Sequence, residues 1–451
     1  MKIKALLCVC AMLPLLSSCG DKQQAAANLP SWLEADSAEA IKARLLSDFS
    51  LTFEEGAEQI IADHPELTID SVRAFAEKHY VEVMEIDGVL RMHRKSPRNL
   101  NLLNPAYNGG WKFRGWNASE ARRSYADSVI RWSKGQLADG AAKQMRVRFS
   151  IDVPFDSALI GDTLRVWMPY PMATDRQTDV RLVSCYPTES VISSPERSAH
   201  SSIYFTAPAP EHGDTAHFEY VVDYVAHGAY FSPETILSGI KPYDKDGDLY
   251  EKYTAFDNRH IIRLDSLARE IVGDETNPYK QSELVYDYII QRYPWAGARE
   301  YSTIECLPQY VLDEGHGDCG QVSLLYISLM RTLGVPARWE SGWMTHPGEL
   351  NLHDWAETYY EGIGWVPVDV SFGRYTNSGD KAIEKFYSTG IDTYRFVANK
   401  TVGGEFDPPK RFVRSETVDA QLGEVECGKG NMFYPAWSRH FEILSCNPVE
   451  Q

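Results

Sequence analysis

Three side chains that could act together in acyl transfer stand in the second half of the chain: Cys319, His353 and Asp369. A cysteine thiol becomes a nucleophile when an imidazole takes its proton and a carboxylate orients that imidazole. Gly317 and Gly320 flank the cysteine in the segment GHGDCGQ, and we expect them to let the backbone bend and a substrate approach closely. These residue types, in this order, predict a Cys-His-Asp catalytic triad.

The residues after Cys319 predict a buried helix. The segment 322–333 is apolar on nearly every helical face, which is typical of a helix inside a core. Gly334 suits the C-terminal cap, and Pro336 prevents the helix from continuing. The first turn would begin at about Cys319, where free N–H groups and the helix dipole are expected to lower the pKa of the thiol.

His353 and Asp369 are expected on the two strands of a hairpin that turns at residues 361–364. Alternation along the first strand places His353 and Trp355 on one face. Pairing Trp355 with Asp369 would bring Asp369 diagonally across from His353, within side-chain reach. This pairing needs a loop with an odd number of residues or a bulge, and the glycines of the turn permit either.

The segments GHGDCGQ, LGVPARWESGW and LHDWAETYYEGIGWVPVDVSFG resemble, in this order, the motifs of the transglutaminase-like superfamily of papain-fold cysteine enzymes. The resemblance covers about residues 255–400. It implies that Cys319 is the nucleophile, His353 the base and acid, Asp369 the orienting carboxylate and Trp355 a supporting residue. Asp354 departs from the family pattern, in which a small residue is common, and its charge is expected to shift the pKa of the adjacent imidazole.

The sequence does not decide which group, besides the backbone N–H of Cys319, would donate the second hydrogen bond to an oxyanion. Trp295, Gln309 and Tyr310 each lie upstream of the thiol and could donate a hydrogen bond. The acidic run at 244–248 lacks the closing glutamate of an EF-hand loop. We therefore expect neither a metal nor another cofactor.

The N-terminal segment predicts export. Lys2 and Lys4 precede an apolar run that ends in Leu-Ser-Ser-Cys-Gly, and this resembles a bacterial lipoprotein signal. Residues 1–18 would be removed, Cys19 would carry lipid, and residues 19–29 would form a tether. An ordinary secretory signal is the alternative. The expected location is the bacterial cell envelope, periplasmic or at the cell surface, with the lipid as the membrane anchor.

The number of cysteines limits the possible disulfides, and the net charge limits the classes of binding partner. Of eight cysteines, four lie outside the leader, the lipidation site and the proposed nucleophile: Cys185, Cys306, Cys427 and Cys446. An even number permits disulfides, and Cys427 and Cys446 are close enough in sequence to bridge neighbouring strands. A net charge of −18 is unsuited to nucleic acid. It could favour cationic substrates such as amines, although solubility alone explains it.

The pattern along the chain predicts an α+β protein with several domains. Residues 30–140 show helical spacing with one hairpin at Asp87-Gly88. Residues 141–240 hold strands with two-residue alternation, which indicate an antiparallel β-sandwich-like domain. Residues 241–451 would form the papain-like transglutaminase core with a C-terminal extension.

The expected activity is attack of Cys319 on an amide bond of a peptide or protein, giving a thioester that water or an amine opens. Water would make the protein a peptidase or amidase, and an amine would make it an acyltransferase. The alternative is a catalytically inactive papain-fold scaffold that binds peptide or glycan in the cell envelope. The abundance of tryptophan and tyrosine would suit stacking on sugars, although such residues often fill β-rich cores.

Overall fold

The structure is a computed structural model that describes residues 38–108, 115–116, 118–133, 137–193 and 198–449. The expected signal, the lipid-bearing Cys19 and the tether lie outside these residues. Within the described ranges, no helix has both the length and the apolar character needed to cross a bilayer.

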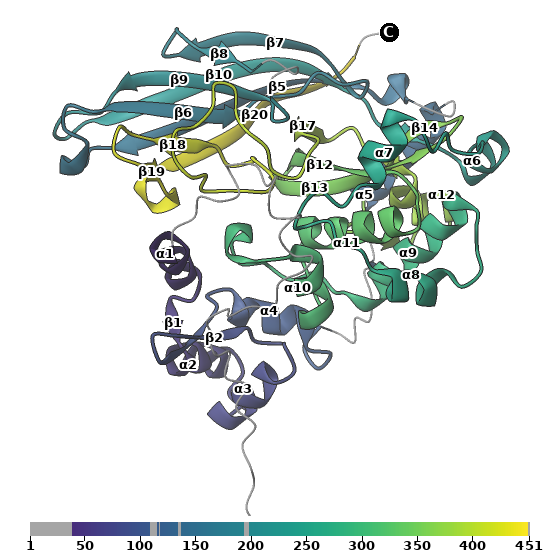
Figure 1. The fold of residues 1–451 in the computed structure, drawn as a ribbon, viewed down its shortest axis with the longest axis horizontal. Helices are drawn as coiled ribbons and strands as arrows, with labels where there is room; N and C mark the ends of the chain where they lie inside the picture. The colour runs from purple at the N-terminus through teal and green to yellow at the C-terminus, as the bar shows by residue number, and fades with distance from the viewer. Residues whose placement is uncertain (1–37, 109–114, 117, 134–136, 194–197, 450–451) are drawn as a thin grey trace, which may run out of the picture.

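A four-stranded antiparallel sheet with a helix layer on one face forms the centre of the molecule (Figure 1). Its strand order is β14 (Gly364–Val368), β13 (Asn351–Tyr360), β12 (Ala337–Met344) and β17 (Arg395–Asn399). The helix against this sheet is α11 (Cys319–Thr332), whose residues from Gly320 to Arg331 are all buried. Around it pack α7 (Asp248–Thr254), α8 (Asp265–Val272), α9 (Pro278–Arg292) and α10 (Leu307–Glu314).

A β-sandwich packs beside this sheet, above it in Figure 1. One of its sheets has the order β20 (Ser438–Pro448), β5 (Lys143–Pro154), β10 (Thr215–Ala226) and β7 (Gln177–Tyr186). The other has the order β19 (Asn431–Met432), β18 (Glu424–Glu426), β6 (Thr163–Pro169), β9 (Ser202–Pro208) and β8 (Val191–Ile192). Trp343 and Phe396 of the central sheet pack into the core of the sandwich, so the two units share one hydrophobic contact.

The predicted strands between residues 146 and 225 are all present, and the α+β class with its antiparallel sandwich is confirmed. Three strands of the sandwich, β18, β19 and β20, come from the end of the chain. The chain therefore enters the sandwich before the central sheet and returns to it afterwards. This return carries the segment between β17 and β18 past the N-terminus of α11.

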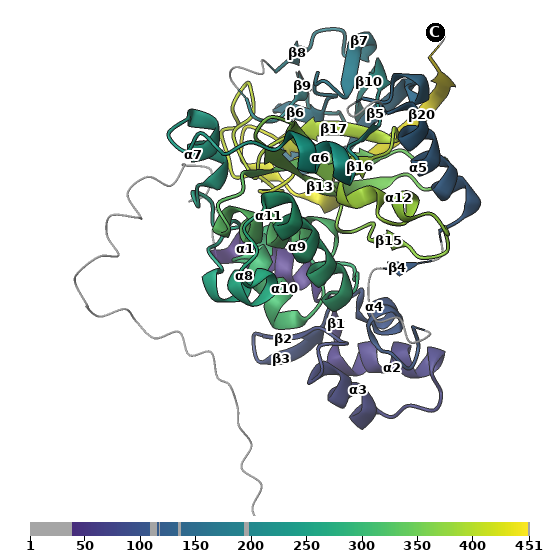
Figure 2. The same ribbon diagram turned by 90° about the vertical axis from the view of Figure 1, so that its right-hand side faces the viewer.

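The N-terminal part forms a small unit below the helix layer (Figure 2). It contains α1 (Ala38–Asp48), β1 (Leu51–Thr52), α2 (Phe53–Asp63), α3 (Ile69–Ala76), β2 (Val83–Ile86), β3 (Val89–Met92) and α4 (Ser96–Leu103). Thr52 and Thr68 begin α2 and α3 with capping boxes, which satisfy free N–H groups of each first turn. Asp87 and Gly88 both have positive φ, as the predicted hairpin turn requires.

The remaining elements are short and cover the edges of the central sheet. They are β4 (Gly115–Trp116), α5 (Glu120–Trp132), β11 (Ala229–Tyr230), α6 (Pro233–Gly239), β15 (Arg374–Tyr375), α12 (Lys381–Glu384) and β16 (Gly390–Ile391).

The five cysteines in the described residues are all free. Cys427 directly follows β18 and Cys446 lies on β20, and these strands belong to the two different sheets of the sandwich. Their closeness in sequence therefore does not make them strand neighbours, and the disulfide considered between them is absent.

Candidate active site

Cys319 is the first residue of α11, as predicted. The Asp318 side chain accepts a hydrogen bond from the Gln321 N–H at 3.2 Å, and the Gln321 side chain accepts one from the Asp318 N–H at 3.0 Å. This capping box defines where the helix begins. A Cβ at position 320 would lie 2.3 Å from the Tyr301 hydroxyl and 2.7 Å from Asp354 Oδ2. Gly320 is therefore needed because these two side chains, rather than a substrate, approach the backbone.

His353 and Asp369 meet as the hairpin register predicts. β13 pairs with β14 so that Ala356 lies opposite Val368, and continuing this register by one residue places Asp369 opposite Trp355. The loop between the strands has three residues, 361–363, which is the odd length that this parity requires. His353 Nε2 lies 2.7 Å from Asp369 Oδ2, and the other ring nitrogen, Nδ1, is left for a second partner.

The carboxylate of Asp369 is held from three directions. Its Oδ1 accepts hydrogen bonds from the N–H groups of Ser371 and Phe372, each at 3.2 Å, and an Arg395 nitrogen lies 3.2 Å from Oδ2. Burial alone would raise its pKa, but His353 and Arg395 outweigh burial and keep the pKa of Asp369 below its usual value. Burial lowers the pKa of His353 despite the Asp369 charge, so the imidazole is neutral at pH 7.

The thiol of Cys319 lies against Asp354. In the described part of the chain, its hydrogen-bond partner is Asp354 Oδ2 at 3.6 Å, and the ring of His353 is not hydrogen-bonded to the sulfur. Asp354 and His353 are adjacent on β13 and so point to opposite faces of the strand. The face of Asp354 is the one that packs on α11, where the Tyr326 hydroxyl meets Thr358 at 2.7 Å.

Two expectations about pKa values are wrong, because Cys319 is buried against Asp354 and because Asp354 faces the thiol and not the imidazole of His353. Burial raises the pKa of the Cys319 thiol well above its ordinary value, and the charges of Asp354 and Asp318 add to this rise. These effects outweigh the helix dipole, which by itself would lower the pKa of the thiol. Asp354 also acts on the thiol rather than on the imidazole, because the main charges acting on the ring of His353 are Asp369, Arg395 and Arg122.

Asp354 itself is fixed by a residue that the sequence motifs did not indicate. The Gln421 amide donates to Asp354 Oδ1 at 2.5 Å and to the His353 carbonyl at 3.0 Å. Burial and the nearby Asp318 and Glu416 raise the pKa of Asp354 well above its usual value. Gln421 reaches this position from the segment between β17 and β18, so no local pattern could have marked it.

A cavity of about 620 Å³ opens at Cys319. Its lining includes Asp318, Cys319 and Asp354 at one end. Other walls come from the N-terminal unit, from residues 295–301 and from the C-terminal segment. These contribute residues such as Arg44, Lys95, Arg98, Trp295, Tyr301, Asp419 and Arg439. Four distant parts of the chain therefore build the space next to the thiol.

The other candidates from the motifs have structural contacts. Trp295 lines the cavity, whereas the Gln309 amide donates to Asp313 at 2.8 Å on the exposed side of α10. Tyr310 packs against Arg299, whose guanidinium lies 5.5 Å from the ring centroid. Trp355 is fully buried, and its indole donates to Glu340 at 2.5 Å. Of the three candidates for the second oxyanion donor, Trp295 is thus the one that lines the cavity at the thiol.

Residues 265–370 match the family model described as the Transglutaminase-like superfamily. This stretch contains Cys319, the hairpin and Asp369, so the central core of the chain is the part that matches that superfamily. The match agrees with the motifs and with the helix-on-sheet arrangement around α11.

Relatives and solved structures share parts of the chain. An uncharacterized protein of Haemophilus influenzae is 27% identical over 167 residues, which are 30% of this chain and 44% of that protein. The uncharacterized protein YebA of Bacillus subtilis is 26% identical over 170 residues, 32% of this chain and 22% of YebA. The chain thus spans less than half the length of these relatives. A proposed cysteine protease from Cytophaga hutchinsonii aligns with a TM-score of 0.44 and 16% identity, over 69% of this chain and 92% of that one.

Proposed function

We propose that the protein is a cysteine enzyme of the transglutaminase-like type that acts on amide bonds of peptides or proteins. The observation that carries this proposal is the 2.7 Å contact between His353 Nε2 and Asp369 Oδ2 at the strand pair β13–β14, of which β13 packs on the helix that begins at Cys319. In this reaction the Cys319 sulfur attacks the amide carbonyl carbon, and His353 takes the thiol proton on Nδ1. The backbone N–H of Cys319 is a donor for the oxyanion.

The tetrahedral adduct collapses when its C–N bond breaks. His353 returns the proton to the leaving amine, which departs, and the acyl group remains on the sulfur as a thioester. Water then adds to the thioester and gives a carboxylic acid with the regenerated thiol, or an amine adds and gives a new amide. Hydrolysis is the outcome that we propose first, since it needs no second substrate in the cavity.

The resting thiol is protonated in this mechanism, because burial and the neighbouring carboxyl groups raise its pKa. The neutral imidazole of His353 is the matching base, since its own pKa is lowered by burial. Because the thiol lies on the Asp354 face of β13 and His353 points to the other face, this mechanism requires the Cys319 side chain to leave Asp354 and come within reach of His353 Nδ1 when the substrate binds. This makes the enzyme a general-base catalyst rather than one with a preformed thiolate.

The second candidate is a peptide- or glycan-binding protein without catalysis. The observation that favours it is the hydrogen bond of the thiol to a carboxyl oxygen, which opposes ionisation of the sulfur. The large cavity would then serve as the binding site itself.

Mass-spectrometric profiling of peptide libraries, with and without primary amines, tests the enzyme proposal. We expect cleaved or amine-linked products from the wild type, none from Cys319→Ala, and at least a hundredfold slower formation with His353→Ala. Gln309→Ala, on the exposed side of α10, is the matched control and should behave as the wild type. Equal product formation by Cys319→Ala would refute the mechanism, and binding of peptides without any product would favour the second candidate.

We also propose that the protein is lipid-anchored in the cell envelope. The proposal rests on the N-terminal segment before Cys19, which resembles a bacterial lipoprotein signal. Metabolic labelling with a fatty acid should mark the wild type and leave Cys19→Ala unlabelled. Equal labelling of both proteins, or of neither, would contradict the anchor.

A further inference from the structure

A second histidine–aspartate pair is buried close to the pair of the proposed triad. His346 Nε2 lies 3.1 Å from Asp392 Oδ1, and the two residues are 1% and 0% exposed. The ring centroid of His346 lies 5.8 Å from that of Phe372, and the ring of His353 lies 4.8 Å from the same phenylalanine. Phe372 therefore contacts two buried imidazoles, and the proposed mechanism uses only one of them.

Arg395 joins the aspartates of the two pairs. This first residue of β17 places its Nη2 atom 3.0 Å from Asp392 Oδ2 and 3.2 Å from Asp369 Oδ2. Asp369 Oδ2 is also the oxygen that lies 2.7 Å from His353 Nε2. One guanidinium nitrogen thus connects the carboxylate of the proposed triad to a second buried carboxylate.

The guanidinium of Arg395 is enclosed by aromatic rings. Its distance to the ring centroid is 4.7 Å for Phe372, 5.2 Å for Trp355 and 5.8 Å for Tyr387. The residue is 4% exposed, so little water screens its charge. Charges interact more strongly in such an environment than at a surface. A change in the charge of Arg395 is therefore expected to act on both aspartates and on His353.

Asp392 is held in place as an anion. Its Oδ2 accepts a hydrogen bond from the Tyr387 hydroxyl at 2.8 Å, and its Oδ1 accepts one from the Tyr394 N–H at 2.8 Å. Burial opposes its ionisation, but Arg395, His346 and Tyr387 outweigh burial and keep the pKa of Asp392 well below its usual value. Burial lowers the pKa of His346, so this imidazole is neutral at pH 7. Asp392 is therefore the charge that balances Arg395.

Other ionisable groups complete the surroundings of His353. Burial lowers the pKa of His353, the bond to its aspartate opposes this, and the cations Arg395 and Arg122 act in the same direction as burial. Arg122 on α5 pairs with an exposed glutamate. The phenols of Tyr286 and Tyr375 are uncharged at pH 7, because burial raises their pKa values. The aspartate next to His353 along β13 points to the opposite face of the strand. Among the described residues, Arg395 is thus the cation that forms an ion pair with the triad carboxylate.

We propose that Arg395 and Asp392 are positioning residues for the proposed catalytic triad. Asp392 fixes Arg395, and Arg395 holds the carboxylate of Asp369 toward the imidazole. Because two carboxylates share the guanidinium, it orients Asp369 without neutralising it. Asp369 can then still stabilise the imidazolium that forms when His353 takes the thiol proton. This role rests on the proposed function, but the network of charges can be tested without turnover.

Substitutions at the two positions should shift the pKa of His353 in opposite directions. Arg395→Gln removes a positive charge beside the imidazole, so we expect this pKa to rise by about one unit. Asp392→Asn removes the charge that balances Arg395, so the pKa should fall. Arg395→Lys keeps the positive charge and should keep the pKa close to that of the wild type. A merely structural loosening would expose the imidazole and raise its pKa in every variant.

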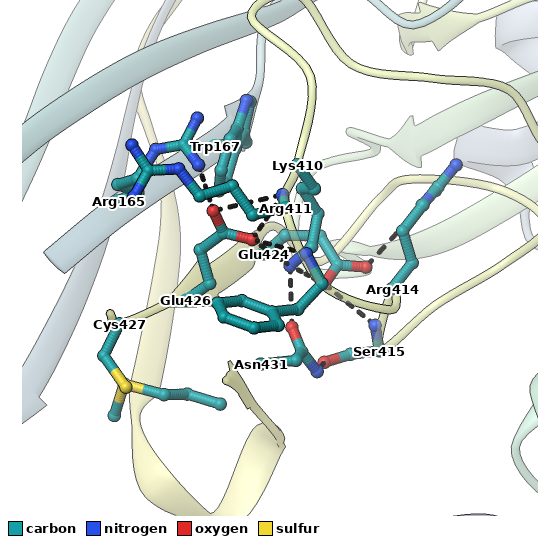
Figure 3. Close-up of polar contacts among 12 residues, drawn as sticks. Arg165, Trp167, Lys410, Arg411, Arg414, Ser415, Glu424, Glu426, Cys427 and Asn431 are labelled. Carbon is teal, nitrogen blue, oxygen red and sulfur yellow. Dashed lines mark hydrogen bonds and ion pairs between the residues drawn. The ribbon is translucent and has the colours of Figure 1, made fainter. Parts of the chain in front are cut away.

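NMR titration of the full chain with ¹³C-labelled histidine measures the pKa of His353. The resonance is assigned by its absence in His353→Gln. Arg165→Gln is the matched control, because Arg165 on β6 also lies over a tryptophan, at 4.9 Å, and pairs with the buried Glu426 (Figure 3). This control removes a similar arginine from the sandwich and should leave the pKa of His353 unchanged.

An unchanged pKa of His353 in Arg395→Gln would overturn the proposal, and so would a rise in Asp392→Asn. Circular dichroism shows whether each variant is folded, and Asp392→Asn with Arg395→Lys carries the test if Arg395→Gln does not fold. In active protein, the acidic limb of the pH profile of kcat/KM should move in the same directions as the pKa. Opposite pKa shifts in a wild type without turnover would instead refute the proposed catalysis and leave the network of charges in place.

Discussion

The Cys319 thiol lies among carboxyl groups, and this is the main local constraint on its chemistry. Asp354 lies 3.6 Å from the sulfur, and Asp318 caps the helix that starts at Cys319. A negative charge near a thiol favours its protonated form, and burial acts in the same direction. The helix dipole alone is thus a poor guide to the reactivity of this cysteine.

Replacing Asp354 by asparagine should lower the pKa of Cys319. The amide keeps the size of the side chain and can donate to the sulfur, so we expect a decrease of about one unit and roughly tenfold faster alkylation by iodoacetamide at pH 7. The reaction is followed on the Cys319 peptide by mass spectrometry, because other thiols are also free. Asp63→Asn is the control, and an unchanged alkylation rate in Asp354→Asn would show that Asp354 does not control the thiol.

At the scale of elements, buried polar side chains join segments that are distant in sequence. His260 is 1% exposed, and its Nδ1 accepts from the Leu307 N–H at 3.2 Å, at the start of α10. Glu424 connects β18 to the segment that carries Asp419 and Gln421. The walls of the cavity therefore depend on contacts that lie outside it.

His260 should make stability depend on pH. Burial and the charge of Arg259 lower its pKa to about 3. The unfolded chain takes up the proton near pH 6.5 while the folded protein does not, so the folded state loses stability as pH falls from 6.5 toward 3. At pH 5 this loss is about 2 kcal/mol for one such histidine. The free energy of unfolding is measured in urea at pH 7.5 and pH 5 for the wild type and for His260→Gln. Its decrease between these pH values should be smaller in His260→Gln by this amount. Equal decreases would exclude His260 as a source of the pH-dependent loss of stability.

Removing the carboxylate of Glu424 should destabilise the C-terminal segment. In Glu424→Ala, Lys410 keeps its buried position but loses its partner at 3.1 Å. The buried ammonium then has the more distant Glu426, at 4.0 Å, as its ion-pair partner, and we expect a loss of about 3 kcal/mol, which urea unfolding can measure. Glu442→Ala is the control, because Glu442 is 44% exposed where it pairs with Arg148. A similar small effect in both variants would show that the buried pair adds no stability.

On the scale of the whole molecule, the N-terminal unit is attached to the central core beside the cavity. The Asn99 side chain donates to the Gly297 carbonyl and accepts from the Gly297 N–H, both at 2.9 Å. The Glu300 N–H donates to Asp48 at 2.6 Å. Because Arg44, Lys95 and Arg98 of this unit line the cavity, its attachment also determines the shape of the substrate site.

Asn99→Ala should loosen this attachment. It leaves two backbone groups of Gly297 without partners, at a cost of about 1–3 kcal/mol. Hydrogen exchange followed by mass spectrometry should show faster exchange across residues 38–108 while α11 keeps its protection. Asn101→Ala, which changes an asparagine of the same helix, is the control. Uniform exchange in all three proteins would mean that Asn99 does not hold the unit in place.

Much of the fold followed from local patterns. The apolar segment after Cys319 indicated α11, and strict alternation indicated β5, β6, β9 and β10. The parity argument for the hairpin gave the contact between His353 and Asp369, because a register fixes which side chains are neighbours. The helix before α9 begins at Asp265, after a turn at residues 258–261.

The sequence by itself determined the class of core and the identity of the His353–Asp369 pair, because both depend on spacing within short segments. Only the tertiary structure decided what surrounds the thiol. Asp419 and Gln421 arrive there from the connection that leaves the central sheet and returns to the sandwich, and Lys95 and Arg98 arrive from the N-terminal unit. Their effect on the sulfur depends on burial and on distances across the cavity, and neither is encoded in the spacing of residues along the chain.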